Sequence, residues 1–193
     1  MEFPSGTLSF DEVEVGQSWK SAGRTVTEAD IVHFAGISGD FNSIHINHEF
    51  AKKTPFRKPI AHGMLVFSFA TGLSLHSPPM KTMAIIQIKE LSFLLPVFAG
   101  DTVHLESRIL EKIPRGRGRR GEVIWLREIV NQIGKVVQRG TIITLVAGSD
   151  IKTGDSESNN GNNESSPKEC SNATGTEGNG KPEISSKETA LTN

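Results

Sequence analysis

The chain has 193 residues, and its 21 lysines and arginines are balanced by 22 aspartates and glutamates, so the formal net charge is −1. This length allows one domain of ordinary size with a tail to spare. The near-neutral balance gives no reason to expect nucleic acid or an anionic membrane as the main partner.

Cys170 is the only cysteine, so no internal disulfide can form and a reducing compartment is favoured. The N-terminal residues carry acids and lack the basic-then-apolar pattern of a signal peptide. The longest apolar run, around residues 64–75, is too short to span a bilayer. We therefore expect a soluble, cytoplasmic protein.

The first predicted elements are a strand near residues 17–26 and a helix that begins directly after it. Thr27 is a good N-cap residue, and Asp30 lies three residues further on, in the first turn. Apolar residues then give this helix one buried face, and we expect it to end at Gly36.

The stretch from residue 37 to residue 63 is rich in residues that favour bends, and it holds Asp40 and His45 five positions apart. We predict a loop here, followed by a short helix over residues 48–53. A carboxylate and a histidine on a loop can share one proton-transfer task. The alternative is structural: Asp40 caps a turn, Asn42 stabilises it and His45 is a satisfied interior histidine.

A nearly wholly apolar helix is predicted over residues 62–75. Its apolar residues point in almost every direction, which indicates burial on all sides. Gly72 in its middle suggests that another backbone passes close by. At its start the free N–H of Gly63 would face the loop, where negative charge could develop. An acid, an imidazole and an anion-binding helix end are what a site needs to move a proton and a water beside a carbonyl.

Four strands are predicted after this helix, over residues 83–95, 102–110, 122–131 and 135–146, the last two joined by a short hairpin. With no helices between them, these strands should pair antiparallel. Helices early in the chain and strands late indicate an α+β domain.

Four arginines lie in a glycine-rich loop between the second and third of these strands, at Arg115, Arg117, Arg119 and Arg120. They could be a solvated hairpin tip or a contact for a phosphate group, since the arginine fork suits phosphate oxygens. Nucleic acid is the weaker alternative, because no aromatic residues are interleaved with the arginines.

Three motifs carry a family resemblance. Residues 37–45, ISGDFNSIH, resemble the hydratase motif of the MaoC-like family, the (R)-specific enoyl-CoA hydratases and 3-hydroxyacyl dehydratases of the hotdog fold. Residues 61–65 and 91–101, AHGML and LSFLLPVFAGD, resemble the next two signatures, so the similarity runs in order over roughly residues 8–147. One departure is Ser43, where the family usually has proline.

The resemblance implies a single hotdog domain over residues 1–148, with an antiparallel sheet wrapped around a buried central helix. It also implies a homodimer whose sheets join edge to edge. The implied reaction is reversible hydration of trans-2-enoyl thioesters, carried by coenzyme A or acyl carrier protein, to (R)-3-hydroxyacyl thioesters. We expect no cofactor.

In this reaction Asp40 and His45 would bind a water between them, and the Gly63 N–H would hold the thioester oxygen. Which of the pair is base and which is acid stays open. The candidate substrate-binding residues are Asn42, His62, Thr71, Arg115, Arg117 and Arg119. A hotdog thioesterase and a non-catalytic acyl-binding protein are the alternatives, and the presence of both Asp40 and His45 argues against them.

Two further features are outside this reaction. His45, His48, Glu49 and His62 could suggest a metal site, but no cysteine pair supports one, and we predict none. Residues 149–193 are dominated by Gly, Ser, Asn, Thr, Glu and Lys and contain too few apolar residues to offset the entropy of ordering. We predict a disordered tail there.

Overall fold

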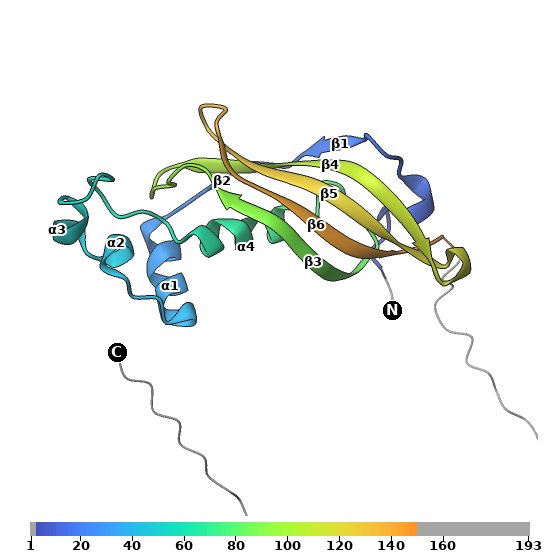
Figure 1. Cartoon of the computed structure of the whole chain (residues 1–193), viewed down its shortest axis with the longest axis horizontal. Helices are drawn as coiled ribbons and strands as arrows, with labels where there is room; N and C mark the ends of the chain where they lie inside the picture. Colours follow the sequence, from blue (N-terminus) through green and yellow to red (C-terminus); the bar gives the residue numbers. More distant parts are fainter. Residues whose placement is uncertain (1–2, 150–193) are drawn as a thin grey trace, which may run out of the picture. The chain divides into compact units, whose positions relative to one another are not determined.

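A six-stranded antiparallel sheet curves over a central helix, α4, in the computed structural model, which describes residues 3–149 (Figure 1). The helices are α1 (Glu28–Ser38), α2 (Ser43–Ile46), α3 (His48–Ala51) and α4 (Gly63–Leu73), with short 3₁₀ turns η1 (Phe10–Glu12) and η2 (Gly116–Gly118). The strands are β1 (Ser18–Lys20), β2 (Arg24–Thr25), β3 (Thr82–Phe93), β4 (Thr102–Arg115), β5 (Arg120–Asn131) and β6 (Val136–Ala147). The α+β prediction is confirmed.

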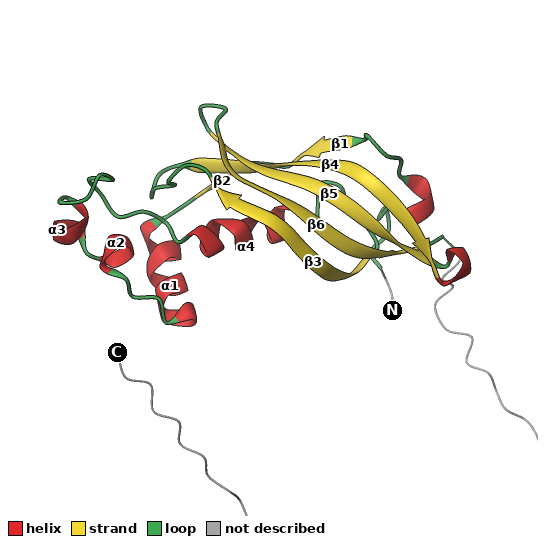
Figure 2. Cartoon of the chain, viewed as in Figure 1, coloured by secondary structure: helices red, strands yellow, loops and turns green. Residues whose placement is uncertain are grey.

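The long strands form the sheet in the order β1-β4-β5-β6-β3, and β2 pairs with the other end of β4. Consecutive strands β4, β5 and β6 are hairpin neighbours, whereas β3 pairs with β6 and is left at the edge. Helices α1, α2 and α3 gather at one end of the sheet, and the β4–β5 hairpin tip lies at the other (Figure 2).

The predicted strand over residues 17–26 is instead two short strands. Lys20 pairs with Glu106 and Arg24 pairs with Val103, so four steps along this segment face three steps along β4. One extra residue must bulge out of the ladder. Ser21 continues the pairing of β1 with β4, because its N–H donates to the Leu105 carbonyl and its hydroxyl accepts from the Leu105 N–H. The extra residue therefore lies between Ser21 and Arg24.

Helix α1 begins as predicted, with Thr27 and Asp30 forming a capping box. It continues past Gly36 and ends at Gly39, which has a left-handed φ of 75° and donates its N–H to the Ala35 carbonyl. The predicted end at Gly36 was wrong because a glycine can remain inside a helix at a modest cost. The later glycine is the one that meets the left-handed cap.

One hydrophobic cluster lies between α4 and the sheet. It brings together helix residues such as Leu65, Val66 and Phe69 with Val103, Leu105, Ile129 and Val137 of the strands. A second cluster lies under η1 and is centred on Trp125, with Phe10, Val13, Ile109, Val123 and Val146. Together they fix α4 and the inner face of β5, which position the pockets described below.

Helix α4 is not buried on all sides in the single chain. Met64 is 50% exposed, and Ser68 and Gly72 are also exposed, so an open stripe runs at intervals of four residues. No atom lies within 4 Å of a Cβ built on Gly72. The predictions of all-round burial and of a backbone close to Gly72 were therefore wrong for one chain, because the sheet covers only one side of the helix.

The inner row of β5 alternates with an outer row, as expected for a half-buried strand. Val123, Trp125, Arg127 and Ile129 are buried, whereas the residues between them are partly exposed. Arg127 is the one charged residue in that buried row. Among the described residues, no helix has both the length and the apolar character needed to cross a membrane.

Candidate active site

Asp40 follows directly after the left-handed C-cap of α1, and a series of local bonds shapes the loop that carries it. The Asp40 N–H donates to the Ser38 hydroxyl at 3.2 Å, and Asp40 Oδ1 accepts from the Asn42 N–H at 3.2 Å. Its carboxylate remains about half exposed, at 52%. The loop thus presents the second carboxylate oxygen to the surroundings.

His45 lies in the four-residue helix α2 and not in a loop, which corrects the prediction for this stretch. Asn42 caps α2 by accepting from the Ile44 N–H at 3.1 Å, and Asn47 caps α3 by accepting from the Phe50 N–H at 2.9 Å. Ser43 occupies the first position of α2, where proline is also well suited. The departure from the family motif therefore leaves the local fold intact.

The His45 ring is held by the chain segment just before α4. Its Nδ1 lies 2.8 Å from the carbonyl oxygen of Ile60, and its side chain is only 9% exposed. A carbonyl can only accept, so Nδ1 carries the proton and Nε2 offers a lone pair.

Burial lowers the pKa of His45 below its ordinary value. The bond to Ile60 and the charge of Asp40 oppose this shift, and the neighbouring His62 adds to it. His45 is therefore a neutral imidazole at neutral pH, able to accept a proton on Nε2.

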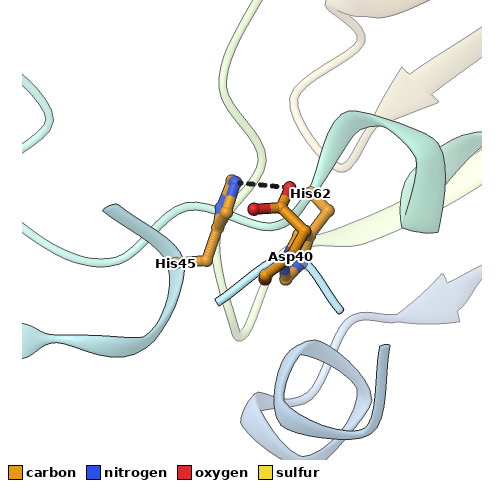
Figure 3. Close-up of side chains that lie close together, drawn as sticks. All are labelled: Asp40, His45 and His62. Atoms are coloured by element: carbon orange, nitrogen blue, oxygen red, sulfur yellow. Dashed lines mark hydrogen bonds and ion pairs between the residues drawn. The ribbon is translucent and has the colours of Figure 1, made fainter. Parts of the chain in front are cut away.

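Asp40 Oδ2 and His45 Nε2 face each other at 3.8 Å (Figure 3). This separation is too long for a direct hydrogen bond, and both atoms are acceptors when His45 is neutral. A water between them can donate one hydrogen to each and keep a free lone pair on its oxygen. The geometry suits activation of one water.

His62 lies behind the pair and contacts both of its members. It is 3% exposed, its ring stacks on His45 with centroids 3.8 Å apart, and its Nε2 lies 2.9 Å from the backbone oxygen of Asp40. Its Nδ1 is buried without a partner among the described residues. His62 therefore contacts both members of the pair, and the substrate-binding role predicted for it stays a prediction.

Gly63 begins α4 and lines a cavity of about 500 Å³, here called the Gly63 pocket, together with His45, Ile60, Met64, Phe93 and Gln138. No described residue accepts its N–H, which is one of the free donors of a helix start. A Cβ at this position would lie 2.6 Å from Cε1 of Phe93. The site thus combines a water position, a free N–H and an apolar pocket.

The other predicted binding residues lie elsewhere. The side chain of Asn42 caps α2, and Thr71 lies near the C-terminal end of α4, at the opposite end from Gly63. Arg115, Arg117 and Arg119 are on the β4–β5 hairpin at the far end of the sheet, where Arg115 pairs with Glu122 at 2.8 Å (Figure 1). The structure does not bring these five positions to the Gly63 pocket of the same chain.

Gln138 is a site residue that sequence reasoning missed. It is 3% exposed, and its Nε2 donates to the Gly63 carbonyl at 2.8 Å, which ties β6 to the start of α4. Its Oε1 has no partner among the described residues. The sequence did offer one indication of this role: Gln138 is a polar residue within a strand whose other residues are mostly apolar.

Asp40, His45 and His62 offer possible metal-ligand atoms within 4.8 Å of one another. However, one nitrogen of each imidazole ring already faces a backbone carbonyl. Such a bond also orients the ring of a metal-binding histidine, so both rings are fixed in place whichever chemistry they serve. The free N–H of Gly63 and the adjoining apolar pocket favour proton transfer next to a carbonyl.

An antiparallel sheet over one central helix, with an acid, a histidine and a helix start at its end, defines a hotdog-fold protein with a proton-transfer site. The sequence matches the MaoC like domain over residues 11–125. The chain belongs to the MaoC-like family.

Two relatives support this assignment in different ways. The chain is 34% identical to the (R)-specific enoyl-CoA hydratase of Rhodospirillum rubrum, over 71% of this chain and 90% of that protein. The solved (R)-hydratase of Aeromonas caviae is 32% identical, with a TM-score of 0.58, and the match covers 68% of this chain and 96% of that one. A Mycobacterium tuberculosis protein with a double hotdog fold, 20% identical, has a TM-score of 0.67 over 79% of this chain and 48% of its own, and this likeness concerns the fold alone.

Proposed function

We propose that Asp40, His45 and Gly63 carry out the reversible hydration of trans-2-enoyl thioesters. The protein is a hydro-lyase that adds water to an enoyl thioester or removes it from a 3-hydroxyacyl thioester. The observation that carries the roles of the residues is the 3.8 Å gap between Asp40 Oδ2 and His45 Nε2, next to the free Gly63 N–H.

In the hydration direction, the water oxygen bonds to the carbon that is β to the carbonyl. The water's proton passes to His45 Nε2, while Asp40 holds its second hydrogen. The electron pair of the double bond moves toward the carbonyl oxygen, where the Gly63 N–H stabilises the charge. The imidazolium then gives its proton to the α-carbon, which balances the addition of one water. Dehydration is the same path in reverse.

Crotonyl-CoA is the substrate that tests this proposal. Loss of enoyl absorbance without release of free thiol is expected, with the (R)-3-hydroxy thioester as product, as the names of the relatives suggest. Thiol release would make the protein a thioesterase. Saturable binding without either signal would make it a non-catalytic acyl-binding protein.

We also infer that two copies pair through their β3 edges. Within residues 3–149, strand β3 has a neighbour only on its β6 side, and its Ile85, Ile86 and Ile88 are 45%, 50% and 43% exposed. An apolar edge strand invites pairing with another strand. Ile86→Lys should convert a dimer to a monomer in light scattering, whereas Ile133→Lys, at a hairpin position that is 71% exposed, should not.

The thioester carrier and the location are inferred at a coarser level. Coenzyme A and acyl carrier protein share the pantetheine arm that would enter the Gly63 pocket, and kinetics with both carriers will separate them. A single cysteine fits a reducing compartment such as the cytoplasm. Fluorescent tagging of the full chain in its own cells tests that location.

A further inference from the structure

Arg127 is a buried cation without a counter-charge. It projects from the inner row of β5 and is 8% exposed, and it makes no hydrogen bond or ion pair with any described residue. The guanidinium lies over the face of Trp125, with its central carbon 5.6 Å from the ring centroid. Burial lowers its pKa to about 10. Burying an unpaired charge costs free energy, and a bound anion would offset that cost.

A cavity of about 320 Å³, here called the Arg127 cavity, adjoins this guanidinium at the C-terminal end of α4. Hydroxyl groups line it together with Arg127, on Thr71, Ser74, Thr82 and Thr144, and none of its lining residues is acidic. The end of α4 supplies about half a negative charge at most, and it makes no bond to the guanidinium. The cavity therefore combines a cation and hydroxyl groups with apolar side chains, Leu75, Met80 and Ile85, and its lining contains no protein anion.

Shared lining residues connect the Arg127 cavity to the Gly63 pocket. A narrow space of about 10 Å³ lies between them and is lined by both Arg127 and Gln138, and Gln138 also lines the Gly63 pocket. On the sheet, Arg127 is opposite Gly140, and Gln138 is two residues further along β6. Such diagonal neighbours have Cα atoms roughly 7–8 Å apart. A chain that begins at Gly63 and runs along α4 thus reaches the guanidinium.

The narrow space is about as wide as one water, so an acyl chain has to displace a side chain there. Leu91 lines it and is only half-buried on the edge strand β3, whereas the other apolar wall residues, Phe67, Ala70 and Ile129, are buried in the fold. Leu91 is the side chain best able to turn aside.

We propose that the Arg127 cavity binds a carboxylate at the far end of the acyl chain, so that the preferred substrates are enoyl thioesters of dicarboxylic acids. This proposal rests on the hydration proposed above. The thioester lies at Gly63, the chain passes Gln138, and the distal carboxylate pairs with Arg127. A charge-assisted bond of this kind in a buried site gives both affinity and selection against a methyl-ended chain.

The kinetic test compares trans-2-decenedioyl-CoA with trans-2-decenoyl-CoA, which has a methyl group in place of the carboxylate. Ten carbons match the roughly 12 Å of helix between Gly63 and Thr71. The wild type should favour decenedioyl-CoA in kcat/KM. Arg127→Met should lower kcat/KM for decenedioyl-CoA by about 30-fold or more and leave or improve that for decenoyl-CoA. Arg127→Lys, which keeps the charge, should retain part of the preference. Arg108→Met, at an exposed arginine of β4, is the matched control and should change neither.

A second measurement does not depend on turnover. Trp125 is one of two tryptophans, so in a Trp19→Phe background its fluorescence reports directly on Arg127. Glutarate should change this signal with saturation at constant chloride concentration, whereas 1-pentanol, which has no carboxylate, should not. Arg127→Met should abolish the response.

The two proposals can fail separately. Glutarate binding without hydration of any thioester would overturn the hydratase mechanism and support the anion site. Crotonyl-CoA hydration, with no preference for decenedioyl-CoA over decenoyl-CoA and no glutarate response, would overturn the anion site alone. A shift of Arg127→Met from dimer to monomer, with no glutarate response in the wild type, would assign the counter-charge to a second copy and also overturn it. An equal response to chloride would reduce it to a general anion site.

Discussion

The two ends of α4 place polar groups in opposite situations. At the N-terminal end, backbone carbonyls satisfy one nitrogen of His45 and one of His62, and the remaining His45 lone pair faces the Gly63 pocket. At the C-terminal end, the Arg127 guanidinium has no hydrogen-bond partner among the described residues. Bonds to the backbone fix a group in place for chemistry, whereas an unpaired buried group needs something from outside the chain.

The largest expected effect removes the pair at the N-terminal end. Asp40→Asn and His45→Gln should each lower kcat by about 10²–10⁴, since each removes one side of the water site. The double variant should be little worse than either single one, because groups that act as a unit are non-additive. Steady-state kinetics with crotonyl-CoA measure this.

His48→Gln is the matched control for this pair. His48 is an exposed histidine nearby, paired with Glu28 on the surface, and its substitution should leave kcat unchanged. A folded Asp40→Asn protein with near-wild-type hydration would contradict the shared-water mechanism.

The next effect isolates the Gly63 N–H. Phe93→Ala makes room for a side chain at Gly63, and in that background Gly63→Pro removes the N–H while Gly63→Ala keeps it. His62 has φ −59° and ψ 135°, which a following proline accepts. The proline variant should lose about 10²–10³ in kcat relative to the alanine variant. Equal kcat values in these two variants would show that another group holds the oxygen.

A smaller effect concerns the pH profile. Because the pKa of His45 is lowered below about 6.5, kcat/KM should stay flat as pH falls through 6.5 and drop only at lower pH, where His45 gains a proton. His62→Phe and His62→Gln both remove the ring that helps to lower this pKa, so both should move the acid limb to higher pH.

The two His62 variants differ in one bond. Glutamine can still donate to the Asp40 carbonyl and phenylalanine cannot, so only His62→Phe should also lower kcat. An acid limb that stays in place in both variants would show that His62 does not act on His45.

The smallest effect is on stability at the other end of α4. Arg127→Met replaces an unpaired cation by a flexible apolar side chain, and without ligand it should raise the free energy of unfolding by about 1 kcal/mol. For a domain of this size that corresponds to a melting temperature roughly 2–4 °C higher. Calorimetry should show no comparable change for Arg108→Met. A lower melting temperature would mean that Arg127 is paired in the folded protein.

Local patterns predicted much of the fold. The Thr27–Asp30 box, the start of α4 at Gly63 and the three long hairpin strands follow from capping chemistry and apolar alternation, and these act over a few residues. The pair of Asp40 and His45 was found by its motif. The tail from residue 150 onward lies outside the described residues and stays a prediction.

Other features depend on contacts between distant segments, which spacing along the chain does not encode. The Ile60 carbonyl fixes the tautomer of His45. The motif that contains His62 suggested a substrate-binding residue and gave no sign that its ring stacks on His45. The bulge between Ser21 and Arg24 depends on the register of this segment against β4.

The sequence by itself determined which residue types were available for proton transfer and where each element begins, since both are local properties. Only the tertiary structure decided what each polar group meets. It moved the arginine hairpin to the far end of the sheet, placed Gln138 against Gly63, and left Arg127 in a cavity without an anion. The physical reason is that burial and pairing of a charge depend on neighbours brought together by folding, and a cation in a polar sequence pattern looks the same whether it is solvated or buried.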